Sequence, residues 1–305
     1  MTVVLPVHNE VGHARDEIER VDRAMKASRY SYELLVIDDG STDGSKDVLR
    51  AMEGIELVDL PVNRGVGFAR RLGTRIGRGE IVVWTDVDMS YPNDKIPELV
   101  DELDEWCDQV IGARRTEEGT HRWARLPAKW FIRKLACFLV RQDIPDLNTG
   151  FRAFRRKVAL PYLHLLPDGF SCVSTITLCF LSNGHTVRYT PIDYEKRAGT
   201  SKFRYFHDTY NYLLQVIRMV MTFNPLRVFL PVGGLLLLVA FLKVVWDAFH
   251  RDFWITTNAV ILTVVAWQVI SIGLLADLIC RLNSPSRRGM RREDEQEFAK
   301  LRRHQ

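Results

Sequence analysis

The sequence predicts an α/β fold with a mostly parallel sheet, followed by two membrane-spanning helices. In the first part of the chain, short apolar runs alternate with segments in which apolar residues recur every three or four positions. This alternation is typical of strands joined by helices that cover both faces of a parallel sheet. Near the other end, two apolar stretches are each long enough to cross a hydrocarbon core of about 30 Å. The chain is therefore expected to be a membrane protein with an α/β domain.

The expected strands are five short apolar runs. They are Val3–Leu5, Glu33–Ile37, Glu56–Leu60, Ile81–Thr85 and Gln109–Ile111. Between the first two runs, apolar residues follow one another at three- and four-residue steps, which predicts a helix packed on the sheet. These residues are Val11, Ala14, Ile18, Val21 and Met25.

Polar side chains follow four of the expected strands. They are His8-Asn9-Glu10, Asp38-Asp39, Asn63 and Asp86-Val87-Asp88. In a parallel sheet, ligands bind beyond the carboxyl ends of the strands, so these groups should meet in one crevice. Each group alone could serve as a helix cap or turn former, but their coincidence favours a binding site. The Asp-x-Asp pair offers hard oxygen ligands to a divalent cation that holds a nucleotide diphosphate.

Composition excludes several classes of protein. With 47% apolar residues the chain can bury a substantial core, so it is not a disordered protein. Its 42 basic and 38 acidic residues are too evenly balanced to indicate nucleic acid as a partner. The cysteines form no Cys-x-x-Cys pair and their number is odd, so reduced and packed thiols are expected. They are Cys107, Cys137, Cys172, Cys179 and Cys280.

The two apolar stretches, Val228–Trp246 and Phe253–Ile279, predict a transmembrane hairpin. Two core helices of a soluble bundle are the alternative, but the stretches are long, adjacent and without an alternating polar face. The loop between them carries one arginine, whereas arginines are frequent before the first stretch and after the second. By the positive-inside rule, both ends of the chain are expected in the cytoplasm. The start of the chain reads directly as a strand with no apolar leader, which agrees with a cytoplasmic first domain.

Two segments between the sheet and the hairpin are candidates for helices at the membrane surface. Trp123 to Arg141 combines aromatic and aliphatic residues with basic ones at near-helical spacing. It is either an interfacial helix among lipid headgroups or an amphipathic core helix with a solvated basic face. Tyr205–Phe223 is the second candidate and leads into the first apolar stretch. The arginine-rich tail after Ser286 is suited to contact with anionic lipid.

Five motifs in order carry a resemblance to a known family. They are Leu5-Pro-Val-His-Asn-Glu10, Leu35-Val-Ile-Asp-Asp-Gly-Ser-Thr-Asp-Gly44, Asn63-Arg-Gly65, Asp86-Val-Asp88 and Asn148-Thr-Gly-Phe-Arg152. Together they resemble the signatures of glycosyltransferase family 2, in particular the polyprenyl-phosphate sugar transferases of the dolichol-phosphate-mannose synthase kind. The likeness runs from Thr2 to Phe203, and the two-span tail is similar to that of bacterial glucosyl-transferring members.

The resemblance implies a GT-A fold, a nucleotide-sugar donor, Mg²⁺ or Mn²⁺ as cofactor, and inversion at the anomeric carbon. The residues that it implies for the donor pocket are Pro6, His8, Glu10, Ile37, Asp39, Asp86, Val87 and Asp88. Asp86 and Asp88 would hold the metal, because these cations favour carboxylate and phosphate oxygens. Many relatives carry glutamine two residues after the second aspartate. This chain has Ser90 there, a shorter and weaker ligand, so water is the alternative occupant.

Three basic residues and one acid complete the site that the resemblance implies. Arg114, Arg197 and Lys202 match phosphate-binding groups, and both residue types suit a diphosphate. Taken alone, Arg197 to Lys202 is only a basic glycine-containing loop, but its place before the hairpin makes it a candidate lid. Asp146 matches an acid that faces the acceptor; we assign it to orientation first and proton removal second, because a lipid phosphate is already anionic. The expected catalytic residues are Asp88, Asp146 and Arg197.

The expected organisation is a GT-A domain over residues 1–203, a juxtamembrane helix over 204–226, two transmembrane helices over 227–282 and a basic cytoplasmic tail over 283–305. The expected activity is transfer of a hexose from a UDP- or GDP-linked sugar to a polyprenyl phosphate at the cytoplasmic face of the cell membrane, where a hairpin can support homo-oligomers. Two alternatives stay open. One is a hydroxyl acceptor, such as a glycolipid or polysaccharide, although the chain lacks a Gln-x-x-Arg-Trp motif. The other is a catalytically idle membrane scaffold.

Overall fold

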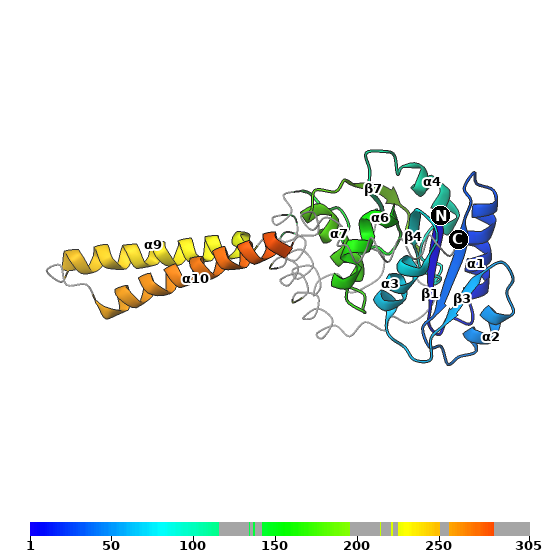
Figure 1. Cartoon of the computed structure of the whole chain (residues 1–305), viewed down its shortest axis with the longest axis horizontal. Coiled ribbons are helices and arrows are strands. Elements are labelled where there is room, and N and C mark those ends of the chain that lie inside the picture. The colour runs from blue at the N-terminus through cyan, green and yellow to red at the C-terminus, as the bar shows by residue number, and fades with distance from the viewer. Residues whose placement is uncertain are drawn as a thin grey trace. The chain divides into compact units, whose positions relative to one another are not determined.

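The chain folds into two compact units, Met1–Val216 and Ile217–Gln305 (Figure 1). The computed structural model describes residues 1–115, 134, 137, 142–195, 214, 221, 225–250 and 256–283. The segment from Trp123 to Arg141, except residues 134 and 137, the segment Tyr205–Phe223, except residues 214 and 221, and the arginine-rich tail lie outside the described residues. The finer division at residues 203, 226 and 282 stays a prediction.

The first unit is built on a seven-stranded sheet in the order β3-β2-β1-β4-β6-β5-β7. The strands are β1 (Thr2–Val7), β2 (Glu33–Asp38), β3 (Glu56–Asp59), β4 (Ile81–Trp84), β5 (Gln109–Arg114), β6 (Arg152–Arg155) and β7 (Val187–Ile192). Strand β6 runs antiparallel to β4 and β5, and the other strand pairs are parallel. The prediction of an α/β fold with a mostly parallel sheet is confirmed.

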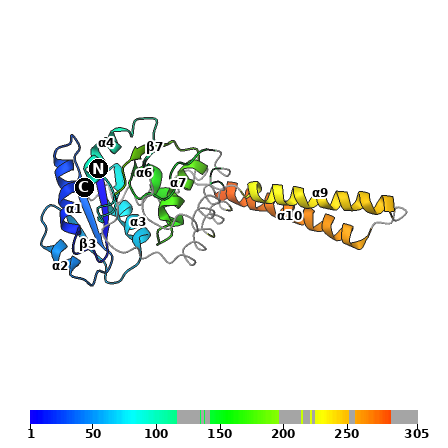
Figure 2. The same cartoon turned by 180° about the vertical axis from the view of Figure 1, so that it is seen from behind.

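Helices cover both faces of this sheet, and Figures 1 and 2 show α1 and α3 on opposite sides of the central strands. The helices are α1 (Ala14–Lys26), α2 (Ser45–Arg50), α3 (Val66–Ile76), α4 (Ile96–Asp101), α6 (Arg156–Ala159) and α7 (Cys172–Ser182), with the 3₁₀ helices η1 (Asn93–Lys95) and η2 (Leu160–Leu165). Successive side chains of a strand point to opposite faces of the sheet, so the core has one part on each face. Leu5 packs in one cluster with Ile18 of α1. Val4 faces α3, where a Cβ on Gly73 would lie 2.4 Å from Val4 Cγ1.

The five strands expected from the sequence are confirmed, but two others were missed. Strand β6 has four residues and begins and ends with arginine, so its composition resembles a loop. Strand β7 lies at the end of the sheet and has only one buried side chain, which weakens the alternation of apolar and polar residues along it. Since β6 is central and mostly buried, its short length and its terminal arginines, and not exposure, explain why no apolar run marks it.

The predicted first helix is correct from Ala14 onward, but Val11 does not belong to it. Helix α1 begins at Ala14, and the side chain of Val11 is 45% exposed. The Val11 amide instead donates to Asp43 Oδ2 at 3.1 Å, which ties this residue to the loop after β2. The hydrogen bond that the Val11 backbone N donates to this aspartate, 32 residues away in the chain, takes the place of a helical one.

The second unit contains two long helices, α9 (Leu226–His250) and α10 (Thr257–Asn283), which pack together as a hairpin. Both are long and apolar enough to cross a membrane, and most of their side chains stay unburied within the chain. Small residues bring them close, since a Cβ on Gly233 would lie 2.4 Å from Ile270 Cγ1. The buried carboxylate of Asp247 accepts hydrogen bonds from Lys243 and from Thr256 at the start of α10. The predicted apolar hairpin is confirmed, with its second helix starting at Thr257 rather than at residue 253.

Candidate active site

The carboxyl ends of four parallel strands lie along one edge of the sheet. Val7 at the end of β1 pairs with Asp38 at the end of β2, and Asp38 pairs with Asp59 of β3. On the other side, Val4 of β1 pairs with Trp84, the last residue of β4. The polar groups that follow these strands are therefore brought to the same edge, where open α/β sheets bind their ligands.

Asp86, two residues after β4, is held by a buried arginine. Arg70 of α3 donates from Nη2 to Asp86 Oδ1 at 2.6 Å, and its guanidinium also lies 5.7 Å from the ring centroid of Trp84. Arg70 is 3% exposed, whereas the Asp86 side chain keeps 30% exposure. A Cβ at position 150 would lie 2.5 Å from Arg70 Nη2, so any larger residue would displace the guanidinium from this pair. The ion pair explains why Gly150 stands in the Asn-Thr-Gly motif.

Asp88 is turned by its own neighbours in the chain. Both the backbone N and the Oγ of Ser90 donate to Asp88 Oδ1, at 3.1 and 2.5 Å. Met89 between them has a φ of 63°, a left-handed conformation that non-glycine residues rarely adopt. The Ser90 hydroxyl thus acts on the carboxylate of Asp88, which fits an orienting role better than that of a metal ligand.

The two aspartates fit a divalent cation of the Mg²⁺ or Mn²⁺ type. Mg²⁺ in nucleotide sites usually takes one or two carboxylates and completes its shell with phosphate oxygens and water. Within the described part of the chain, no three His, Cys, Asp or Glu residues come close enough to hold a metal by themselves. Asp86 and Asp88 therefore suit a cation that arrives with a diphosphate, and not a metal held by protein alone.

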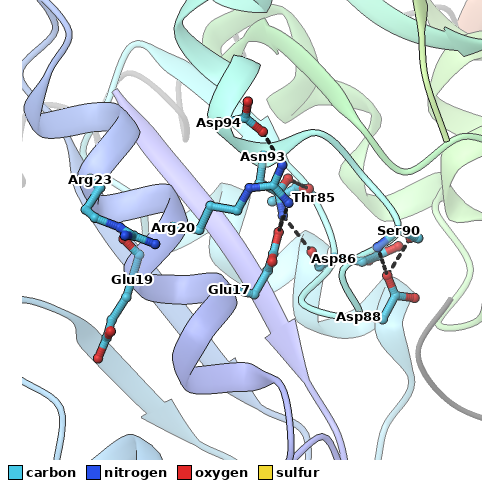
Figure 3. A network of polar contacts seen from close by, with 10 residues as sticks. All are labelled: Glu17, Glu19, Arg20, Arg23, Thr85, Asp86, Asp88, Ser90, Asn93 and Asp94. Carbon is cyan, nitrogen blue, oxygen red and sulfur yellow. Dashed lines mark hydrogen bonds and ion pairs between the residues drawn. The ribbon is translucent and has the colours of Figure 1, made fainter. Parts of the chain in front are cut away.

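A buried polar network lies behind this turn, and it was missed by the sequence analysis (Figure 3). Asn93 donates from Nδ2 to the backbone oxygen of Asp86 at 3.0 Å and to Glu17 Oε1 at 2.7 Å, and its Oδ1 accepts from the Thr85 hydroxyl. Glu17 of α1 is fully buried, and burial raises its pKa although Asn93 and Arg20 oppose the rise. One signal was available: Glu17 stands on the apolar face of an amphipathic helix, where a carboxylate needs a partner.

Asp146 and Arg114 form a second ion pair at the site. Arg114 Nε donates to Oδ2 at 2.7 Å and Nη2 donates to Oδ1 at 3.0 Å, while the backbone N of Asn148 also donates to Oδ1. Asp146 is 9% exposed, so burial favours its neutral form, but the hydrogen bonds and charge of Arg114 outweigh burial and hold its pKa below the usual value. A carboxylate with a lowered pKa is a weak base, so this geometry favours orientation over proton removal.

Arg152, the last residue of the fifth motif, stabilises the loop between Asp146 and β6. It is fully buried and donates to the backbone oxygens of Thr149 and of Val173 in α7. Desolvation and the nearby charge of Arg70 lower its pKa to about 10. Its hydrogen bonds connect the Thr149-Gly150 turn to α7.

The loops after β1 and β2 are tied to each other and to the start of α3. His8 Nδ1 lies 2.8 Å from the backbone oxygen of Asp39. The Asp39 carboxylate is 2% exposed, and its two oxygens accept from the backbone N of Arg64 and of Gly65 at 2.7 and 2.8 Å. In this structure Asp39 shapes the Asn63-Arg64-Gly65 turn. Its place in a base pocket stays a prediction.

The remaining expected site residues differ in accessibility. Pro6 lies inside β1 opposite Ile37, and Ile37 is fully buried against α3, so both belong to the core of this structure. Val87 is also buried, whereas His8 and Glu10 are partly exposed in the loop after β1.

Arg197 and Lys202 lie outside the described residues. The chain that leads to them is tied to the site, because the backbone N of Glu195 donates to the Ser90 oxygen at 3.0 Å. This bond brings the segment after β7 to the turn that carries Asp86 and Asp88.

Comparison with known proteins gives matches over both units. The family model Glycosyl transferase family 2 matches residues 2–162, and the model GtrB C-terminal hairpin matches residues 224–282. Two similar relatives are the undecaprenyl-phosphate 4-deoxy-4-formamido-L-arabinose transferases of Aeromonas hydrophila and Proteus mirabilis. They are 28% and 27% identical over 300 residues, which cover 92% of this chain and 89% of each relative.

Solved structures share the fold of the first unit. Glucosyl-3-phosphoglycerate synthase from Mycobacterium tuberculosis, in complex with Mn²⁺, uridine-diphosphate-glucose and phosphoglyceric acid, superposes with a TM-score of 0.59. The two chains are 20% identical, and the match covers 72% of this chain and 79% of that protein. A complex of the same enzyme with Mg²⁺ and uridine-diphosphate has the same TM-score and identity. At this level of identity the likeness concerns the fold.

Proposed function

The chain belongs to glycosyl transferase family 2, and we propose that it transfers a hexose from a UDP- or GDP-linked sugar to a polyprenyl phosphate, with inversion at the anomeric carbon. The observation that carries the proposal is the joint presence of the paired aspartates at the sheet edge and the apolar helical hairpin in one chain. Relatives named as undecaprenyl-phosphate sugar transferases support the lipid acceptor, since they cover nearly the whole chain.

Asp86 and Asp88 would hold Mg²⁺ or Mn²⁺ together with the donor diphosphate. When bound, the cation supplies positive charge to the diphosphate that leaves. Arg70 directs the Asp86 carboxylate, and Ser90 does the same for Asp88. The partly exposed His8 and Glu10 are proposed to face the nucleoside, with Asp39 behind them.

The bond change itself needs little proton transfer. An oxygen of the lipid phosphate forms the new bond to the anomeric carbon, while the bond from that carbon to the diphosphate breaks and its electrons leave with the nucleotide. Because the attacking phosphate is anionic, positioning and charge stabilisation supply most of the rate. Asp146 and Arg114 are proposed to orient the acceptor side of the site, and Arg197 and Lys202 to neutralise the departing diphosphate.

A hydroxyl acceptor would make a different demand on Asp146. It would require a general base, and a base works best when its pKa lies near the working pH. The pair with Arg114 moves the pKa of Asp146 in the opposite direction. The ionised pair therefore favours an acceptor that is already charged.

The hairpin would anchor the enzyme in the cell membrane. Large apolar side chains along both helices are exposed within the chain, as expected of surfaces that face lipid. We propose that the sheet-containing unit and both chain ends lie in the cytoplasm, where nucleotide sugars are available. The same apolar surfaces could support homo-oligomers in the membrane.

The proposal is tested with membranes that contain the full chain. They are incubated with polyprenyl phosphate, Mn²⁺ and a panel of radiolabelled UDP- and GDP-sugars, and the organic-extractable, acid-labile label is counted. We expect one sugar to enter the lipid phase. Asp88→Ala should abolish this transfer while the melting temperature of the protein stays near that of wild type. Near-normal transfer by the Asp88→Ala protein would remove the metal site from the reaction. If no donor gave a lipid product, the proposal of a polyprenyl-phosphate acceptor would be overturned.

A further inference from the structure

The turn that carries the two aspartates contains neither helix nor strand. Strand β4 ends at Trp84, and the next helix, η1, begins at Asn93. Met89 inside the turn is held in a left-handed conformation that costs energy for a side chain of its kind. Such a turn keeps one shape only if its surroundings impose it.

Asn93 is the residue that connects this turn to the rest of the fold (Figure 3). Its side-chain amide uses both donors and its acceptor at once: Nδ2 donates to the Asp86 backbone oxygen and to Glu17 Oε1, and Oδ1 accepts from the Thr85 hydroxyl. Asn93, Thr85 and Glu17 are all fully buried. One side chain thus binds the main chain at Asp86, the end of β4 and helix α1.

Glu17 is costly to keep at its position for reasons of packing alone. It lies on the buried face of α1 beside Ile18 and Val21, where an apolar residue would be expected. Its Oε2 has no hydrogen-bond partner among the described residues, and Arg20 reaches Oε1 only at 3.5 Å. A buried carboxyl with an unpaired oxygen lowers stability. Its one short hydrogen bond goes to the amide that holds Asp86.

We propose that Asn93, with Glu17 and Thr85, positions the main chain at Asp86 and thereby sets the directions of the Asp86 and Asp88 carboxylates toward a divalent cation bound with a nucleoside diphosphate. These three are positioning residues, because they are fully buried and would act on the cation only through the two aspartates. The inference rests on the proposed function, since it assumes that the aspartates hold that cation. Residues behind metal ligands typically change metal affinity about 10- to 100-fold when they are replaced.

The test measures binding and stability separately in the full-length protein purified in detergent. Binding of radiolabelled UDP and GDP is followed by equilibrium dialysis as Mn²⁺ is increased, and the melting temperature is recorded for each variant. We expect Asn93→Ala to raise the half-saturating Mn²⁺ concentration at least about 10-fold. Thr85→Val, which removes one hydrogen bond to Asn93 and keeps the side-chain shape, should raise it about fivefold.

Two further variants separate positioning from packing. Glu17→Gln keeps an oxygen that can accept from Asn93, so its Mn²⁺ dependence should stay close to that of wild type, whereas Glu17→Leu should raise the requirement. The matched control is Thr2→Val. Thr2 is as fully buried as Thr85, and its hydroxyl bonds Glu33 and Gly79 at the opposite edge of the sheet. Its loss should lower the melting temperature and leave the Mn²⁺ dependence unchanged.

Each outcome decides between the inference and its alternatives. Wild-type Mn²⁺ dependence in both Thr85→Val and Glu17→Leu overturns the inference, even if Asn93→Ala does not fold. An equal shift in Thr2→Val also overturns it, because general destabilisation would then be the cause. A wild-type protein that binds neither UDP nor GDP with Mn²⁺ overturns the proposed function, and the inference falls with it.

Discussion

Replacing Asp146 by asparagine tests what the ion pair with Arg114 does. In the native protein, Arg114 makes two side-chain hydrogen bonds to Asp146, of 2.7 and 3.0 Å, and its backbone N lies 3.3 Å from Oδ2. Asparagine keeps the size of the side chain but exchanges one acceptor oxygen for a donor NH₂ group. One charge-assisted hydrogen bond is lost, and the charge of Arg114 is left in a site where its side chain is only 13% exposed.

The expected cost follows from this burial. Removing one partner of a buried ion pair destabilises proteins by about 3–5 kcal/mol. Because Arg114 retains some access to solvent, we expect the lower end, about 3 kcal/mol. In a domain of this size, 1 kcal/mol lowers the melting temperature by about 2–4 °C, so a fall of roughly 6–12 °C is expected.

A double-mutant cycle provides the assay. Thermal unfolding in detergent is measured for Asp146→Asn, Arg114→Gln and the double variant. Each single variant leaves one member of the pair buried without its partner. The free energy of unfolding that the double variant loses should therefore be smaller than the sum of the two single losses by about 2 kcal/mol. Additive losses, or a melting temperature of Asp146→Asn within a degree of wild type, would refute the pairing argument.

Activity gives the second readout for the same variant. If Asp146 orients the acceptor side of the site, Asp146→Asn should lower kcat/KM about 100-fold without changing the shape of the pH–rate profile. If Asp146 removes a proton, the variant should lose the acidic limb of that profile. The second result would favour a hydroxyl acceptor over a lipid phosphate.

Three further outcomes are expected. The pKa of Asp146 is lowered on folding, so its contribution to stability is complete above the unfolded pKa of about 4 and is lost as pH falls through the folded pKa. The difference in melting temperature between wild type and Asp146→Asn should therefore be constant from pH 8 to about pH 5 and shrink below about pH 4. Gly67→Ala should lower the melting temperature by about 4–8 °C, because the new Cβ would lie 2.2 Å from a backbone oxygen of the loop before α7, whereas Gly169→Ala, with no atom within 4 Å, should not. In the hairpin, Gly233→Val should loosen the contact with α10 and lower the melting temperature in detergent, while Gly234→Val should match wild type, because a Cβ there meets nothing within 4 Å.

Much of the fold could be predicted because burial leaves a pattern in the sequence. Strands β1, β2 and β4 are apolar runs that end at polar residues, and α1 repeats its apolar residues at helical spacing. Strands β6 and β7 were missed, since one is bounded by arginines and the other is half-buried. Only long-range pairing makes them strands: β6 pairs with β4 and β5, and β7 pairs with β5.

The site was predictable to a more limited extent. Asp86 and Asp88 were found because two carboxylates directly after a buried strand lie where α/β sheets bind ligands and can hold a divalent cation. Arg70, Asn93 and Glu17 were missed, because their importance depends on partners 16, 7 and 76 residues away in the chain.

By itself, the sequence determined the α/β class, the apolar hairpin and the identity of the acidic pair, because each of these depends on local periodicity or on residues adjacent in the chain. Tertiary structure alone decided which charges meet. It pairs Arg70 with Asp86 and Arg114 with Asp146, and it brings Asn93 within hydrogen-bond distance of the Asp86 backbone oxygen. Hydrogen bonds and ion pairs act over about 3 Å, so only the folded chain brings these distant residues within reach of one another.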